Sequence, residues 1–397
     1  MKSNADTTTT INFSLTSAQS NTNGIYMTTD TDSGKPVYYY RGNVDNHIIF
    51  ANYCWRIVRT TETGGVKLIY DGVPTDGQCN NTGDAATIGK SAFNSNYRSP
   101  ADVGYMYGTR YTYKQQTMSS LSGSIVFGND VTYTNGTYTL IDTYTLTDAS
   151  NWSTEYKTIA SKYHYTCFTS SDTCEKVDYI YYTGSSYSNY FELSGGKNHL
   201  DILKEMLDNS SNENDSKIKT TIDTWYETNM TSYTSQLEDT VFCNDRSYDA
   251  SKSGWNKDYS NSSSVTLLFN SYQRINRSHK PTLVCTNAND KFTVDASNGN
   301  GALEYPVGLL STDEIMNAGA TLLSSNSSFY LINGNYQWAL SPSNILSTNI
   351  TVYFFENGFS VSYAGATGDV RPVISLKPKT ELTDGTGTAT DPFIILS

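Results

Sequence analysis

The sequence predicts an α+β protein, and two observations favour this fold class. Segments with the two-residue alternation of β-strands, bounded by turn residues, occupy both ends of the chain. Segments with the three- and four-residue spacing of helices are grouped between them, mainly within residues 198–239. Because the helices are grouped rather than alternating with single strands, an α+β arrangement is favoured over an α/β fold with a parallel sheet.

The first strands are expected to form hairpins at the start of the core. Residues 25–27 and 37–40 flank the turn cluster TTDTDSGK, which predicts two antiparallel strands. The turn at residues 62–65 supplies glycines where a hairpin needs positive φ. Further strands are therefore expected at residues 47–50, 54–59 and 66–70.

Two longer helices are expected in the middle of the chain. Residues 198–208 place leucines on one stripe, and residues 217–239 repeat apolar side chains at helical spacing. The second helix contains Trp225 and is expected to break near Asn229, where Thr and Ser begin to dominate.

A third, short helix is predicted by its end signals. Ser311 and Glu314 have the spacing of a capping box, and Gly319 follows as a helix-ending residue. The apolar residues 305–310 are expected to form a strand immediately before this helix.

The composition divides the chain into a core and its additions. Residues 101–195 are rich in Tyr and Thr and alternate strongly at 137–147, which predicts an antiparallel β insertion. The stretch from Tyr336 to Leu376 contains two alternating apolar segments and is expected to anchor the fold. The predicted organisation is a flexible leader at 1–23, a discontinuous core at 24–100 and 196–380, and a C-terminal strand or start of a linker at 381–397.

Charge and hydropathy exclude two classes of partner. The net charge is −12, and no Lys/Arg-rich run is present, so binding to nucleic acid or to an anionic membrane surface is not expected. No stretch approaches the roughly 18–20 apolar residues of a membrane span, so direct membrane insertion of this segment is not expected either.

The cysteines indicate an oxidising compartment. They form three sequence-local couples flanked by turn residues, which favours local disulfides, although six cysteines allow fifteen connectivities. Residues 1–6 are polar from the start, so the chain is interpreted as a secreted or surface-anchored segment without its signal or anchor. The expected couples are Cys54/Cys79, Cys167/Cys174 and Cys243/Cys285.

Several sequence blocks together resemble a known family. In order they are CWRIVRTTETGGVKLIYDG, CNNTG with SAFN, IDTWYETNMTSYTSQLEDTVFCNDRS, YPVGLLSTDEIMNAG, QWALSPSN, GDVRPVISLKPK and DGTGTATDPFII, within about residues 24–100 and 196–395. They resemble uncharacterised secreted and surface proteins of gut-dwelling Gram-positive and wall-less bacteria. The core of that family is similar to the C-type-lectin-like fold of formylglycine-generating enzymes.

The resemblance implies a structural role for several residues. In such a fold the first and last strands lie side by side, so residues 55–58 are expected to pair with 370–376, with the helix around Trp225 beneath them. Trp55 is expected in the same framework, and Arg371 is expected to hold loop carbonyls or a carboxylate. A formylglycine-generating enzyme needs a reactive cysteine pair near its C-terminal core. No cysteine follows Cys285, so that activity is not expected.

Catalytic motifs are absent from the sequence. The four histidines are scattered, and there is no Gly-x-Ser-x-Gly elbow, P-loop or dinucleotide fingerprint. The adjacent pairs Glu238-Asp239 and Asp313-Glu314 fall at helix ends, where capping and dipole effects explain them better than glycoside hydrolysis does. We therefore expect no enzyme and no cofactor other than calcium.

Two sets of candidate site residues remain. The loop at 289–301 offers Asp290, Asp295 and Asn298 as oxygen ligands for a possible calcium ion. The C-terminal stretch offers aromatic rings for stacking and amides for hydrogen bonding, although the same residues also suit a core hairpin. These candidate ligand-binding residues are Trp338, Asn344, Tyr353, Phe355 and Tyr363.

The functional hypothesis is an extracellular adhesin. It would recognise a host or environmental glycan or protein through loops of a lectin-like domain. One alternative is a secreted hydrolase or protein-modifying enzyme whose site is assembled from distant carboxylates. Another is a hypervariable or phage-type receptor-binding protein, since Asn, Tyr, Ser and Thr are abundant in the C-terminal hairpin.

Overall fold

The computed structural model describes most of the chain outside the Tyr/Thr-rich region. In residues 109–206 it describes only strands, and the expected helix at 198–208 lies outside the described residues except for its last two. The described residues are 1–15, 24–95, 100–108, 207–208, 210–248, 266–322, 329–346 and 349–395, together with the strands β8 to β14.

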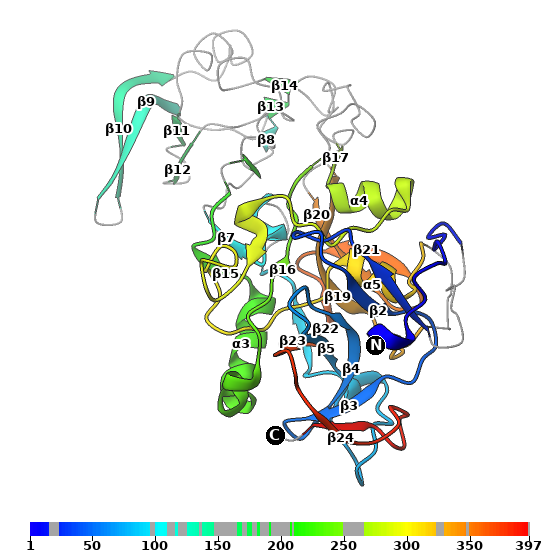
Figure 1. Cartoon of the computed structure of the whole chain (residues 1–397). Coiled ribbons are helices and arrows are strands. Elements are labelled where there is room, and N and C mark those ends of the chain that lie inside the picture. Colours follow the sequence, from blue (N-terminus) through cyan, green and yellow to red (C-terminus); the bar gives the residue numbers. More distant parts are fainter. Residues whose placement is uncertain are drawn as a thin grey trace.

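The first of two main sheets contains both ends of the core (Figure 1). The predicted hairpins are confirmed, because β1 pairs antiparallel with β2, β3 with β4 and β4 with β5. The C-terminal strand β25 lies parallel to β3. The eight strands are β1 (Ile25–Thr28), β2 (Val37–Tyr40), β3 (His47–Phe50), β4 (Tyr53–Thr60), β5 (Val66–Tyr70), β23 (Val373–Leu376), β24 (Leu382–Asp384) and β25 (Phe393–Ile395).

The expected pairing of residues 55–58 with 370–376 is wrong in one respect. β23 pairs antiparallel with β5, and β5 in turn pairs with β4, so β5 lies between the two segments. The hairpin at residues 62–65 folds β5 back onto β4, and this leaves the other edge of β5 for the returning chain. Early and late strands therefore share a sheet, one strand further apart than expected.

The second sheet is built around the stretch that was expected to anchor the fold. Its path is β21-β20-β19-β22-β6, with β17 also paired to β19. β19 and β20 pair antiparallel, with register shifts near Pro342, which has no N–H to donate to the ladder. The strands are β6 (Lys90–Ala92), β17 (Thr266–Leu268), β19 (Gln337–Leu346), β20 (Asn349–Phe355), β21 (Phe359–Tyr363) and β22 (Thr367–Asp369).

Smaller strands complete the β structure. β7 (Met106–Tyr107) pairs with β15 (Asn214–Asp215), and β16 (Phe242–Cys243) pairs with β18 (Lys291–Phe292). In the region of the expected β insertion, β9 and β10 form an antiparallel pair to which β11 and β12 are added. Figure 1 draws these four strands to one side of the two main sheets. The strands of this region are β8 (Gln116–Thr117), β9 (Ile125–Thr134), β10 (Thr137–Leu146), β11 (Tyr165–Phe168), β12 (Thr173–Lys176), β13 (Tyr181–Tyr182) and β14 (Tyr190–Phe191).

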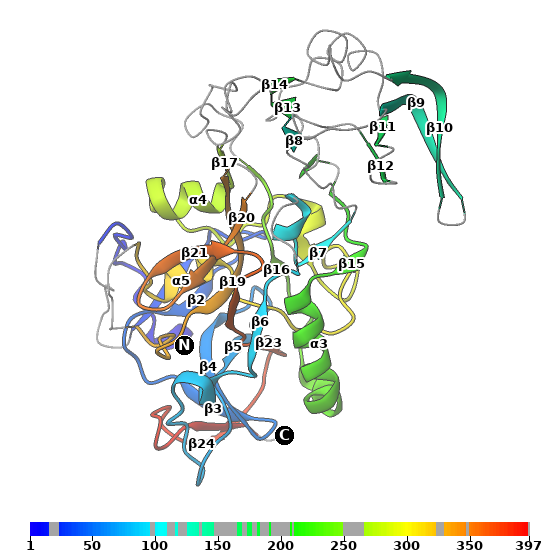
Figure 2. The same ribbon diagram turned by 180° about the vertical axis from the view of Figure 1, so that it is seen from behind.

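The α3 helix (Lys217–Asn229) begins where the sequence predicts, but it ends at the predicted break and does not continue to residue 239. The Ser216 hydroxyl accepts a hydrogen bond from the backbone N–H of Lys219 and caps the helix. The predicted break near Asn229 is confirmed, because a 3₁₀ turn, η6 (Thr231–Gln236), replaces the α-helix there. Figure 2 shows α3 beside β6 and β23, and its buried face is Ile218, Lys219, Ile222 and Tyr226.

The remaining helices are short. In α5 (Thr312–Ala318) the capping box is confirmed: Ser311 accepts from the N–H of Glu314, and the Glu314 carboxylate accepts from the N–H of Ser311. The strand expected at 305–310 is wrong; only Gly308 forms an isolated bridge, to Val373. Pro306 lacks an N–H and cannot donate to a ladder. Gly308 packs closely against the Phe242 ring, which leaves no room for a side chain at this position. The others are α4 (Asn270–Gln273), the π-turn η8 (Arg274–Ser278) and the 3₁₀ turns η1 (Lys2–Asn4), η2 (Gly83–Ala86), η3 (Pro100–Val103) and η9 (Ala288–Asp290).

An aromatic cluster joins α3 to the first sheet. Trp55 is fully buried and donates its indole N–H to the carbonyl of Phe50 at 3.0 Å. Trp225 of α3 makes edge-on contacts with Trp55 and Tyr70, with ring centroids 6.2 and 5.3 Å apart. Such pairs add about 0.5–1.5 kcal/mol each beyond the area they bury. The helix around Trp225 therefore packs against β4 and β5.

Arg371 connects the two main sheets from the segment between β22 and β23. Its Nε donates to the Tyr70 carbonyl at 2.7 Å, and its Nη2 pairs with the Asp71 carboxylate at 2.6 Å. Its Nη1 donates to the Leu331 carbonyl and to Gln337 Oε1. Tyr70 and Asp71 belong to the first sheet and its edge, whereas Gln337 begins β19 of the second.

The N-terminal residues lie against the core where they are described. The N–H of Asp6 donates to the carbonyl of Ile25, and the Phe13 ring lies 4.9 Å from the guanidinium of Arg41. Residues 1–15 of the expected flexible leader therefore contact the first sheet.

Replacing Arg371 by Ala is expected to lower the free energy of unfolding by about 3–5 kcal/mol, because it leaves the Asp71 carboxylate buried without its cation. Arg371→Lys keeps the charge but not the planar fork, so it is expected to recover only part of the loss. Urea denaturation measures both. The exposed Lys35→Ala, which also removes a positive charge, is expected to stay within about 0.5 kcal/mol of the wild type. A loss for Arg371→Ala no larger than for this control would contradict the assignment.

Candidate binding cavity

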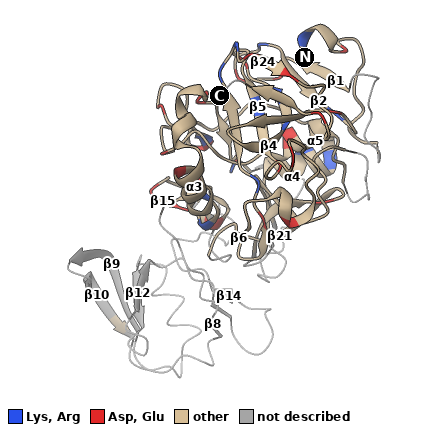
Figure 3. Cartoon of the chain, turned by 90° about the horizontal axis from the view of Figure 1, so that it is seen from below, with Lys and Arg blue, Asp and Glu red and all other residues tan. Residues whose placement is uncertain are grey.

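A cavity of about 290 Å³ opens between the two sheets and the middle segments of the chain. Its walls are the turn between β4 and β5, residues 238–245, the loop that runs from η8 to Cys285, and the start of α5. Lys291 and Asn298 close it on a further side. Lys and Arg as well as Asp and Glu line the cavity, so it carries charges of both signs. Figure 3 colours residues of both charges on the ribbon near β4, α4 and α5.

Glu314 is the centre of the first group of charges. Its Oε1 accepts from Arg59 Nε and from Lys67 Nζ, both at 2.8 Å, while its Oε2 accepts from the N–H of Ser311. Burial by itself would raise the pKa of Glu314, but the two cations and these hydrogen bonds together lower it to about 2. Glu314 therefore stays ionised and joins the β4–β5 hairpin to the start of α5.

Lys67 is a charged residue in an otherwise buried strand. Its side chain is 1% exposed, and its Nζ lies 4.8 Å from the centre of the Phe242 ring. Burial lowers the pKa of Lys67 to about 8, although the negative charge of Glu314 opposes the shift. At neutral pH the ammonium is thus retained mainly by Glu314.

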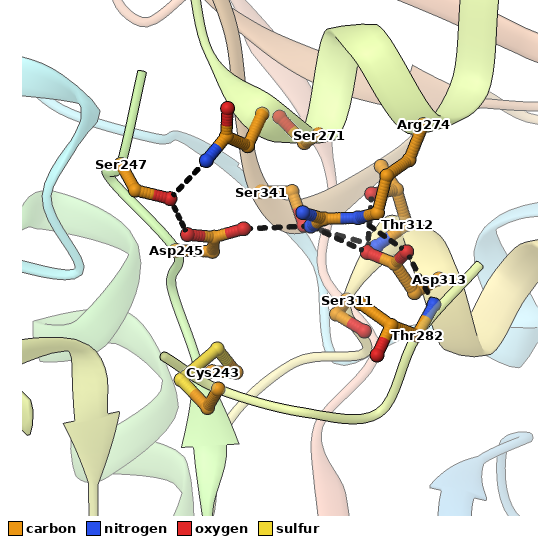
Figure 4. A network of polar contacts seen from close by, with 12 residues as sticks. Cys243, Asp245, Ser247, Ser271, Arg274, Thr282, Ser311, Thr312, Asp313 and Ser341 are labelled. Atoms are coloured by element: carbon orange, nitrogen blue, oxygen red, sulfur yellow. Dashed lines mark hydrogen bonds and ion pairs between the residues drawn. A yellow bond between two sulfur atoms is a disulfide. The ribbon is translucent and has the colours of Figure 1, made fainter. Parts of the chain in front are cut away.

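Arg274 organises the second group of charges (Figure 4). Its Nε pairs with Asp313 Oδ1 and its Nη2 pairs with Asp245 Oδ2, each at 2.7 Å. The N–H of Thr282 also donates to Asp313 Oδ1, at 3.0 Å. The two carboxylates together raise the pKa of Arg274 further above its usual value, although burial opposes this. One guanidinium therefore links α5, the segment after β16 and the loop that follows η8.

A disulfide between Cys243 and Cys285 fastens two walls of the cavity to each other. Beside it, Asp32 Oδ1 accepts from the N–H of Cys285, and Asp32 Oδ2 pairs with Lys291 Nζ at 2.9 Å. The second disulfide, Cys54–Cys79, lies elsewhere and ties β4 to the loop after β5. The expected couples at these four positions are thus confirmed.

Three carboxylates that line the cavity bind only neutral donors. Glu238 accepts from the hydroxyls of Thr61 and Thr63. Asp239 accepts from the N–H groups of Val294 and Asp295 at 2.9 and 2.8 Å, and from the Asn298 amide at 3.2 Å. The third, Glu62, accepts from the N–H of Ser33. Within the part of the chain that the structure describes, none of the three forms an ion pair with Lys or Arg.

Close backbone packing fixes the hairpin over Glu238. A methyl group at Gly65 would collide with the Glu238 carboxylate and with the carbonyl of Leu376. The N–H of Gly65 also donates to the Thr61 hydroxyl at 2.8 Å. The glycine thus permits the turn to approach Glu238, and the rim of the cavity has a defined shape.

The candidate ligand-binding residues of the C-terminal stretch are mostly in the core. Trp338 is 2% exposed, donates to the carbonyl of Ser91 at 2.8 Å and packs between Phe93 and Phe354. Asn344, Tyr353 and Phe355 are also buried, so these side chains do not face a ligand in this structure. Only Tyr363, on the edge strand β21, is exposed, at 48%.

The three proposed calcium ligands are engaged separately. Both oxygens of Asp290 accept from Arg246, one from its backbone and one from its side chain. Asp295 Oδ1 accepts from the N–H of Ser297, and the Asn298 amide binds Asp239. Among the described residues, no group of three or more His, Cys, Asp or Glu side chains is arranged to hold a metal ion.

Two further pairs named in the sequence analysis are the acidic pair Asp313–Glu314 and the cysteine couple Cys167/Cys174. Asp313 and Glu314 sit at the start of α5 and line the cavity, so the helix-end interpretation covers only part of what they do. The side chains of Cys167 and Cys174 lie outside the described residues, although the two positions are opposite each other in the β11–β12 ladder.

The sequence reasoning did not identify the cavity itself. One usable signal was Lys67 in the apolar run VKLIY, because a buried lysine requires an anionic partner. The partner, however, is 247 residues away in the chain, a separation that no local pattern bridges. The cavity depends on such distant pairs.

Comparison with known proteins found no similar family, protein or structure. No family model matches the chain, and neither the curated proteins nor the solved structures contain a match.

Acid is expected to destabilise the protein through Glu314. Because its pKa is lower in the folded chain than in the unfolded one, its contribution is fully present above about pH 4.5 and is lost as the pH falls towards 2. The shift corresponds to about 3 kcal/mol. Denaturation between pH 2 and 7 is expected to show this loss in the wild type but not in Glu314→Gln, which is less stable at pH 7.

The exposed Glu381→Gln is the matched control and is expected to keep the wild-type profile. If Glu314→Gln had the same pH dependence as the wild type, the role given to Glu314 would be wrong.

Proposed function

We propose that the chain is an extracellular binding protein, an adhesin that recognises a host or environmental glycan or protein through the cavity beside α5. The observation that carries this proposal is the preorganisation of the cavity. Arg59, Lys67, Arg274 and Lys291 are each held by a carboxylate before any ligand arrives. Fixed polar groups reduce the entropic cost of binding.

An extracellular location is part of the proposal. Two disulfides, Cys54–Cys79 and Cys243–Cys285, persist best in an oxidising environment. No helix in the described part of the chain has the length and apolar character needed to cross a membrane.

We likewise propose a lectin-like core. It is supported by the first sheet, in which strands from both ends of the core lie together, and by a second sheet formed mainly from the C-terminal stretch. In this arrangement the ligand meets the turns and loops between the sheets, while Trp338 and its neighbours support them from the core.

A secreted hydrolase is the second candidate function. It is favoured by Glu238 and Asp239, adjacent carboxylates that line the cavity without an ion pair to Lys or Arg among the described residues. Glycoside hydrolysis, however, needs one carboxyl group that can donate a proton. Glu314 cannot serve at neutral pH, since its pKa is lowered to about 2, and Asp245 and Asp313 share one guanidinium. The remaining carboxyl groups of the lining are Glu62, Glu238 and Asp239, and all three already accept hydrogen bonds from protein donors. Binding needs no proton donor and is therefore the better supported function.

A glycan array and an array of host and environmental proteins test the proposal with the wild type and a cavity-filling variant. Val241→Trp places an indole in the cavity wall and is expected to weaken binding of a wild-type ligand at least about tenfold. Val73→Trp is the matched control, because Val73 is 55% exposed and lies outside the cavity. It is expected to bind like the wild type.

Thermal unfolding and circular dichroism show whether each variant folds. Thr63→Trp, at the exposed rim, replaces Val241→Trp if the latter does not fold. Turnover of a substrate without stable specific binding would reject the adhesin in favour of the hydrolase, and equal binding by the cavity variant and its control would place the ligand elsewhere.

A further inference from the structure

The charges that line the cavity are not balanced, and this imbalance identifies the chemistry of a ligand. Glu314 is shared by two cations, Arg59 and Lys67, which leaves this group with one positive charge in excess. Arg274 is shared by two carboxylates, Asp245 and Asp313, which leaves that group with one negative charge in excess. The two excesses cancel, and the pair Lys291–Asp32 is neutral.

The residual charge of the cavity therefore belongs to Glu62, Glu238 and Asp239. Each already accepts hydrogen bonds from neutral groups, namely threonine hydroxyls, backbone N–H groups and the Asn298 amide. These contacts hold the carboxylates in position without neutralising them. An anionic ligand would be repelled by them, and each cation of the cavity already has a carboxylate partner.

We infer that the cavity binds a ligand with a primary ammonium group, which lies beside Glu238 and Asp239, and that the ligand is an amino sugar with a free amine. This inference rests on the proposed binding function and names the ligand class for the same cavity. A desolvated ammonium has three donors and no acceptor. The two adjacent carboxylates supply charged acceptors, and within the described chain neither of them forms an ion pair with Lys or Arg.

The other groups in the walls suit the hydroxyls of a sugar. The hydroxyls that line the same cavity are those of Thr61, Thr63, Thr240, Ser311 and Ser341. All five already take part in hydrogen bonds within the protein. Ser311 and Ser341 accept from backbone N–H groups in these bonds, so their hydroxyl protons can be donated to a ligand. The volume of about 290 Å³ lies at the lower end of the range for small-molecule sites. This size suits one sugar unit of an oligosaccharide rather than an extended polymer.

The test uses two probes that differ only in the amine: the trisaccharide of β-1,4-linked glucosamine and its fully N-acetylated form. The wild-type chain is expected to bind the free amine form about ten- to hundredfold more tightly by calorimetry, since acetylation removes the charge but keeps the ring hydroxyls. Added salt is expected to weaken binding of the amine form and to leave the acetylated form nearly unaffected.

Two isosteric variants show whether the named carboxylates are responsible. Glu238→Gln and Asp239→Asn keep acceptors for the threonine hydroxyls and backbone N–H groups but remove the charge. Each is expected to reduce the preference for the free amine at least about tenfold. Glu381→Gln, exposed and outside the cavity, is the control for loss of one negative charge and is expected to keep the preference.

Each other outcome overturns the inference in a distinct way. Equal binding of both trisaccharides would reject the ammonium site but leave the proposed binding function standing. Binding of trilysine without binding of the amine trisaccharide would replace the amino sugar by a protein ligand. Binding of neither trisaccharide would reject the amino sugar class. The proposed function itself would fail only if the arrays also yielded no specific ligand for the wild type.

Discussion

The buried guanidinium of Arg371 is the contact on which the arrangement of the two sheets depends. It reaches the end of β5 through Tyr70 and Asp71 and the beginning of β19 through Gln337. A buried charge is costly unless it is paired and its donors are used, and here the carboxylate and three further acceptors meet that condition. Arg371 therefore holds together the two sheets from which segments of the cavity wall extend.

At the cavity, buried charges are likewise stabilised by pairing, and Glu314 is the central residue. It caps α5 with one oxygen and holds Arg59 and Lys67 with the other. An apolar core of the same volume would often be as stable as such a group of buried charges. What the charges provide is a wall whose polar atoms already have fixed positions. The desolvation of these ions costs free energy in the folded protein. In return, the side chains of the wall are already ordered and would not have to become so on binding of a ligand.

The sequence predicted what depends on neighbouring residues. The hairpin turn at 62–65, the break after Asn229 and the capping box of Ser311 and Glu314 are local signals, because the groups involved are close in the chain. The order of strands was predicted less well. β23 pairs with the edge of β5 that β4 leaves unpaired, and no local sequence pattern shows which edge of a strand is unpaired. Alternating residues such as Trp338 and Tyr353 predict that one face of a strand is buried, whereas residues 337–345 and 350–355 are buried on both faces. The cavity was not predicted because Lys67 and Glu314 meet across the fold.

The burial of the C-terminal aromatic residues changes which surface is available for recognition. Stacking on Trp338 would require its indole to leave the carbonyl of Ser91 and the rings of Phe93 and Phe354, so the cost of exposing it would exceed what one stacked sugar returns. The charged cavity requires no such rearrangement. Its cations are occupied, its disulfide fixes two walls, and the carboxylates of Glu238 and Asp239 are held in place but not neutralised. The proposed recognition is therefore better explained by electrostatic complementarity at the cavity than by aromatic stacking on the hairpin.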